Sequence, residues 1–150
     1  MQKRFPLTDM PMWLVLVLTA VMLPRTILND LGWLDEGTLA YRILALVPFG
    51  IWFVVALVRK TRKPWGDFLV LGVLFGLSLA LAHQVLWDVS SSLGHRPPAA
   101  AVDFANNFGS SFHDLAVRAY TVMISMGIGI GSGAAFAGIA AIVTRFRPKH

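Results

Sequence analysis

The 150-residue chain is 56% hydrophobic with a mean hydropathy of +0.65, which excludes an ordinary water-soluble domain. It contains no cysteine, which excludes disulfides and thiolate chemistry. Apolar stretches long enough to cross a bilayer predict four spans, at about 10–28, 38–58, 67–87 and 115–144. We therefore expect an all-α polytopic membrane protein, a four-transmembrane-helix bundle in one integral membrane domain, with an additional outer amphipathic helix.

The formal net charge of +5 is unevenly distributed along the chain. Nine of the 13 basic residues lie in three segments: Lys3 and Arg4, Arg59 to Lys63, and Arg145 to Lys149. With four spans, these segments share one side of the membrane, and the positive-inside rule makes that side cytoplasmic. The charge thus indicates a multi-pass protein of the plasma (inner) membrane with both termini in the cytoplasm, and we expect no nucleic-acid partner.

The first predicted span contains a proline followed by an arginine. Pro24 cannot donate a backbone hydrogen bond, so it predicts a kink about one turn before the outer end. Arg25 lies roughly 22 Å along the helix from Met10, inside a hydrocarbon core of about 30 Å. An arginine at this depth is a candidate ligand contact, although it can also extend to lipid head groups or pair with Asp30.

Small residues and a histidine share one face of the third predicted span. Gly72, Gly76 and Ala80 repeat every four residues, and His83 follows one turn later. Hydrogen bonding, protonation and metal ligation are all open to His83. The other candidate metal ligands are Asp88, His95, His113 and Asp114. Their spacings do not match a metal-binding motif, so we predict neither a metal nor a cofactor.

The longest connection, residues 89–114, lies on the outer side and precedes the fourth span. Its second half predicts a helix near Ala99–Phe112 that lies on the surface, re-enters the membrane or continues into the fourth span. On one continuous helix, a polar stripe falls within an arc of about 80°. Its members are Asp103, Asn107, Ser110, Asp114, Arg118, Thr121, Ser125 and Ser132.

The fourth predicted span is rich in glycine. Gly127, Gly131 and Ala135 form a ridge of small residues at four-residue spacing. We expect the bilayer to surround the protein, and a second copy or a larger membrane complex to contact Gly72, Gly76, Gly127 and Gly131.

These features predict a non-enzymatic membrane protein that binds or conducts a small polar or anionic solute through an outward-facing polar pocket. Unpaired polar groups at membrane depth are costly, so they should face one another or water. The predicted ligand-binding residues are Arg25, His83, Asn107, Asp114, Arg118, Thr121 and Ser125, and we predict no catalytic residues. The alternative is a non-catalytic accessory subunit of a larger membrane complex, and a third reading is a membrane enzyme that uses His83, His113 and Asp114.

Overall fold

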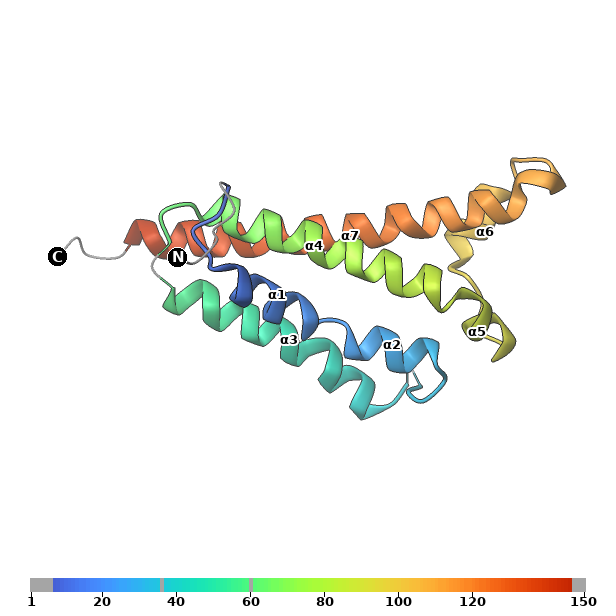
Figure 1. Ribbon diagram of the computed structural model, residues 1–150, viewed down its shortest axis with the longest axis horizontal. Coiled ribbons are helices and arrows are strands. Elements are labelled where there is room, and N and C mark those ends of the chain that lie inside the picture. Colours follow the sequence, from blue (N-terminus) through green and yellow to red (C-terminus); the bar gives the residue numbers. More distant parts are fainter. Residues whose placement is uncertain (1–6, 36, 60, 147–150) are drawn as a thin grey trace.

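In the computed structural model, residues 7–35, 37–59 and 61–146 are described, and every regular element among them is an α-helix. The helices are α1 (Met12–Ala20), α2 (Pro24–Asp30), α3 (Leu39–Val58), α4 (Pro64–Val85), α5 (Trp87–Ser92), α6 (Ala99–Ala105) and α7 (Ser110–Phe146) (Figure 1). Four units are long and apolar enough to cross a membrane: α1 together with α2, then α3, α4 and α7. The all-α prediction is confirmed.

The membrane-length helices place the connections at two ends of the molecule. The start of α1, the connection between α3 and α4, and the end of α7 lie at one end (Figure 1). We call this the basic end, because it carries Arg59, Arg62, Lys63 and Arg145. The opposite end, which we call the distal end, holds α5, α6 and the connection between α2 and α3.

The first span is broken where the proline predicts it. α1 ends at Ala20, and α2 begins at Pro24 after a short turn. Proline is tolerated at the first position of a helix because its missing N–H would be unpaired there in any case. Because of the break, α2 is a separate helix, and it lies in the distal half of the molecule with Arg25 and Asp30.

The closest helix pair is α4 against α7, which meet backbone to backbone. A Cβ atom added at Gly72 would run into the carbonyl oxygen of Gly129 and the Cα of Gly133. At Gly76 the nearest backbone belongs to Ser125 and Met126 of α7. Glycine is required along this contact because any side chain would separate the two helices.

The small residues therefore divide between two roles. Gly72 and Gly76, expected to contact another protein, lie in this contact within the chain, where α7 contributes Gly129 and Gly133. The expected ridge residues Gly127 and Gly131 have no other atoms within 4 Å of an added Cβ. They lie on the face of α7 that is turned away from α4.

An aromatic cluster joins the spans near the middle of the molecule. Trp52 of α3 is fully buried, and its indole N–H donates to the carbonyl of Leu18 at 3.0 Å. Its ring centroid lies 5.9 Å from that of Phe75 in α4 and 5.7 Å from that of Phe136 in α7. Phe49 stacks on Phe136 at 6.1 Å. One tryptophan thus connects the first span to the other three.

A buried carboxylate holds the basic end together. Asp67 of α4 is fully buried and accepts hydrogen bonds from the hydroxyls of Thr8 and Thr61. It also accepts from the backbone N–H groups of Asp9 at 2.7 Å and Met10 at 3.2 Å. These bonds fix the segment before α1 and the connection before α4 to the same side chain.

The predicted polar stripe is interrupted, so the expectation of one helical face from Asp103 to Ser132 is wrong. α6 ends at Ala105 and folds back against α7, where Ala101 and Ala105 pack with Val117. The Asn107 amide donates to the carbonyls of Asp103 at 3.3 Å and Phe104 at 3.0 Å. This side chain satisfies carbonyls that the helix end leaves free, and the turn after it starts α7 in a new direction.

Candidate functional site

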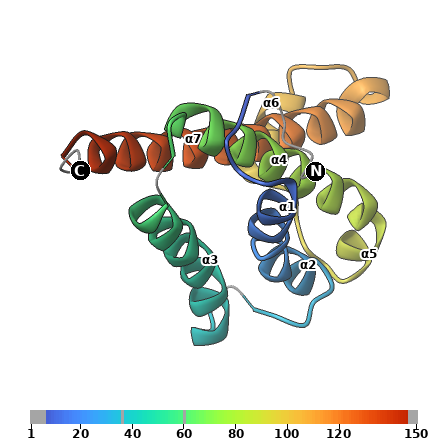
Figure 2. The ribbon, with the colours of Figure 1, turned by 60° about the vertical axis from the view of Figure 1, so that its left-hand side comes forward.

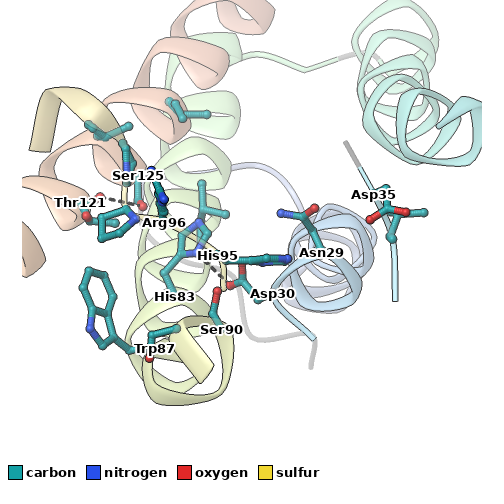
Figure 3. Close-up of a pocket in the computed structure, with 17 residues that line it drawn as sticks. Asn29, Asp30, Asp35, His83, Trp87, Ser90, His95, Arg96, Thr121 and Ser125 are labelled. Atoms are coloured by element: carbon teal, nitrogen blue, oxygen red, sulfur yellow. Dashed lines mark hydrogen bonds and ion pairs between the residues drawn. The ribbon is translucent and has the colours of Figure 1, made fainter. Parts of the chain in front are cut away.

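A cavity of about 680 Å³ lies at the distal end, between α2, α4, α5 and α7 (Figure 3). We call it the wide cavity. The connection from α5 to α6 passes over it and contributes His95 and Arg96. Its other polar lining residues are Asn29, Asp30, Asp35, His83, Ser90, Ser91, Thr121 and Ser125. Segments far apart in sequence thus place charged and hydrogen-bonding groups around one space.

The histidine of the third span pairs with the last residue of α2. His83 Nδ1 lies 2.9 Å from Asp30 Oδ2, which is an ion pair when His83 is protonated. Asp30 is only 5% exposed, and its Oδ2 has no other partner among the described residues. The Arg25–Asp30 pair considered from the sequence is not formed, because the carboxylate faces α4 instead of turning back toward Arg25.

Two hydroxyls of α7 line the opposite wall (Figure 3). Thr121 and Ser125 are buried, and their hydroxyls donate to the carbonyls of Val117 at 2.9 Å and Thr121 at 3.0 Å. With the proton used inside the helix, each hydroxyl oxygen keeps lone pairs that can accept a hydrogen bond from a ligand. This wall therefore offers acceptors beside the apolar side chains of Ile124 and Ile128.

A smaller cavity of about 180 Å³ adjoins the wide one, and we call it the narrow cavity. Three of its lining residues are absent from the wide cavity: Arg25, Thr26 and Tyr41. Its other lining residues also line the wide cavity: Asn29, Leu79, His83 and Ile128. Arg25 Nη1 donates to the Tyr41 hydroxyl at 3.2 Å, and its guanidinium lies 5.1 Å from the centre of the Tyr41 ring. The predicted contact Arg25 is therefore next to His83 but in a separate compartment.

Three predicted site residues lie outside both cavities. Arg118 bridges Asp114 at 3.1 Å and Asp88 at 3.6 Å, and its guanidinium lies 4.8 Å from the centre of the Trp87 ring. Asn107 caps the end of α6, as described above. The structure thus groups His83, Thr121 and Ser125 in the wide cavity, places Arg25 beside it, and leaves Asn107, Asp114 and Arg118 elsewhere.

Below the wide cavity the interior is filled. Leu79 lines the cavity and also belongs to the hydrophobic core, one turn before His83 and one turn after Phe75. Phe75 contacts the buried Trp52, so the aromatic cluster lies directly beneath the cavity. The side chains at the rim, including Ser91, Arg96 and Pro97, are exposed. The wide cavity therefore opens at the distal end and is closed toward the basic end.

The site residues predicted from the sequence omit seven polar residues of the wide cavity: Asn29, Asp30, Asp35, Ser90, Ser91, His95 and Arg96. A signal existed for Asp30, because it ends the first span as His83 nears the end of the third, at matching depth. No comparable signal exists for Ser90, Ser91, His95 and Arg96, since their position depends on where α5 and the irregular segment after it lie.

The described residues include no group of three or more His, Cys, Asp or Glu side chains positioned to hold a metal ion. Comparison with protein family models, with curated proteins and with solved structures finds no match to this chain.

Proposed function

We propose that this protein is a multi-pass protein of the plasma (inner) membrane that binds a small polar solute in the wide cavity. Both termini lie in the cytoplasm, so the cavity opens to the outer side. The proposal involves no catalytic step. The single observation that carries it is the convergence of polar groups from α2, α4, α5 and α7 on one cavity of about 680 Å³.

The size and lining of the cavity support a ligand site. Pockets that bind small molecules usually measure about 300–1,000 Å³ and combine apolar walls with a few placed polar groups. Here Leu79, Ile124 and Ile128 supply apolar walls, and the His83–Asp30 pair supplies charge. A buried carboxylate is costly unless it is paired, so the contact between Asp30 and His83 is expected to hold both groups at the wall of the cavity.

The chemistry of the lining favours a polar ligand with both donors and acceptors. Asp30 and Asp35 accept hydrogen bonds, as do the hydroxyl oxygens of Thr121 and Ser125. Arg96 donates from the rim and forms no ion pair with another residue in the described part of the chain. An uncharged polar or zwitterionic solute matches this mixture better than a simple anion does.

The closed base of the cavity favours binding over conduction. A conducted solute needs a polar route to the basic end, whereas Trp52, Phe75 and Phe136 fill the interior below Leu79.

The proposed orientation of the protein in the membrane, with the basic end in the cytoplasm, is supported by its positive charges. The basic end carries Arg59, Arg62, Lys63 and Arg145.

Native mass spectrometry of protein purified in mild detergent tests this proposal. Wild-type protein is expected to retain a bound small molecule, and Ser90→Trp is expected to lose it because the indole obstructs the wide cavity. Ser92→Trp is the matched control, since Ser92 lies on the same helix, is exposed and lines neither cavity. Equal occupancy in Ser90→Trp, or wild-type protein with no bound molecule, would contradict the proposal.

A second candidate function, an accessory subunit of a larger membrane complex, is favoured by the exposed face of α7. Gly127 and Gly131 are exposed there and have open space around them, as a helix-docking face requires. Gly131→Leu is expected to dissociate such a complex in detergent while leaving the α4–α7 contact intact. A bound partner that survives this change would exclude that face as the docking site.

A further inference from the structure

We propose that the narrow cavity is an oxyanion site that holds a phosphate group, distinct from the solute site in the wide cavity. The phosphate comes from a lipid headgroup or from a free anion, which present the same chemistry to the side chains. The proposal goes beyond solute binding and depends on four polar residues: Arg25, Thr26, Asn29 and Tyr41.

The fixed charge in the described lining of the narrow cavity is positive. It belongs to Arg25, whereas His83 at the shared wall is paired with Asp30. Among the described residues, the lining contains no aspartate or glutamate, whereas Asp30 and Asp35 line the wide cavity. The two compartments therefore differ in the charge that they accept, and the narrow one favours an anion.

The hydrogen-bonding groups of the narrow cavity are incompletely used. Thr26 is 5% exposed, and its hydroxyl makes no hydrogen bond to any residue in the described segments. The Asn29 side chain likewise has no such bond. The Thr26 hydroxyl and the Asn29 amide can therefore each donate a hydrogen bond to a bound anion without breaking a bond inside the protein.

Arg25 and Tyr41 are arranged to act together. The Tyr41 hydroxyl accepts from Arg25, which leaves its own O–H free to donate. Arg25 forms no ion pair with a carboxylate of residues 7–35, 37–59 or 61–146. Its planar guanidinium retains further N–H groups, and their geometry suits the two oxygens of a phosphate.

The depth of the narrow cavity suits the phosphate of a lipid headgroup. Arg25 lies five residues before the end of α2, or about 8 Å into the span. The stacked rings of Phe49 and Phe136 join α3 to α7. This contact lies eight residues after Tyr41 in α3 and eight residues after Ile128 in α7. Toward the distal end α3 diverges from α7 (Figures 1 and 2). Tyr41 of α3 and Ile128 of α7 both line the narrow cavity, and we expect a headgroup phosphate to occupy it while its acyl chains remain in the bilayer.

Ligand-dependent unfolding of the full chain in neutral detergent tests the proposal with three probes. These are inorganic phosphate, phosphatidylglycerol, and a diacylglycerol with the same acyl chains but no phosphate. Phosphatidylglycerol is expected to raise the unfolding temperature and diacylglycerol is not. A rise with inorganic phosphate as well would identify the free anion as sufficient. No rise with either phosphate compound would overturn the oxyanion site.

Variants separate this site from general attraction to cations. Arg25→Gln is expected to weaken phosphate-group binding at least tenfold, whereas Arg42→Gln, next to Tyr41 but exposed and outside both cavities, should leave it unchanged. Tyr41→Phe preserves the ring and should weaken binding severalfold, which provides a test if Arg25→Gln fails to fold. Ser90→Trp obstructs only the wide cavity and should still bind the phosphate compounds, so failure of the solute proposal can be distinguished from failure of this one. Unchanged affinity in both Arg25→Gln and Tyr41→Phe would overturn the proposal.

Discussion

His83 Nδ1 lies 2.9 Å from Asp30 Oδ2, so the end of the first span and the end of the third are joined by one polar contact at the wall of the wide cavity. Truncation of either residue leaves the other polar group without its partner. We expect His83→Ala and Asp30→Ala each to lower the free energy of unfolding by about 1–3 kcal/mol. The double variant should lose less than the sum, with a coupling of about 0.5–3 kcal/mol. Additive losses in denaturant titrations would show that the pair contributes no stability.

The α4–α7 contact predicts opposite effects for two neighbouring glycines. Gly133→Ala introduces a methyl group against the carbonyl oxygen of Phe68 and should destabilise the protein by about 1–3 kcal/mol. Gly131→Ala places its methyl group in open space and should be neutral or stabilising by up to about 1 kcal/mol, because alanine favours a helix. Thermal unfolding in detergent measures both. Equal unfolding temperatures for the two variants would contradict the close backbone approach.

Among the acidic residues at the basic end, the buried Asp67 of α4 should contribute most to stability. Asp67→Ala removes the acceptor of two hydroxyls and two backbone N–H groups and should cost about 3–5 kcal/mol. Asp103→Ala, at an exposed position of α6, is the control and should change stability by less than about 0.5 kcal/mol. Chemical denaturation gives both values. A small loss in Asp67→Ala would mean that the segment before α1 is held by other contacts.

The proposed orientation predicts which end is reached from outside the cell. The chain has no cysteine, so single cysteines can be introduced without background labelling. A membrane-impermeant maleimide should label Ser92→Cys at the distal end of intact cells. It should label Arg62→Cys at the basic end only after the membrane is permeabilised. The reverse pattern would invert the topology and place the wide cavity in the cytoplasm.

The sequence predicts the helices well because membrane spans are defined by long runs of apolar residues. Pro24 correctly marks the break in the first span, since proline lacks the N–H that a continuous helix needs. The last helix is less predictable in length. α7 has 37 residues and is about 55 Å long, well beyond a hydrocarbon core of about 30 Å, because the helix begins at Ser110, before the apolar stretch, and its distal part packs against α6 through Ala116 and Val117.

The candidate site is only partly predictable for a related reason. Thr121 and Ser125 lie on the same helical face as expected, because helix geometry fixes their relation. Arg118 continues that face, but it is drawn to Asp88 and Trp87 of α5, whose position the sequence does not indicate. The face of α7 that packs on α4 is likewise decided by the fit between two glycine-bearing helices, and periodicity alone does not choose between Gly129 and Gly131.

The absence of side chains between Gly72 and Gly129 has a mechanical consequence. Two helices in direct backbone contact cannot rotate or separate without losing close packing along their length. The α4 and α7 sides of the wide cavity therefore form a rigid wall. The α2 side follows a helix break at residues 21–23, and α5 and the connection after it line the rest of the cavity, so any change in cavity width must come from these segments.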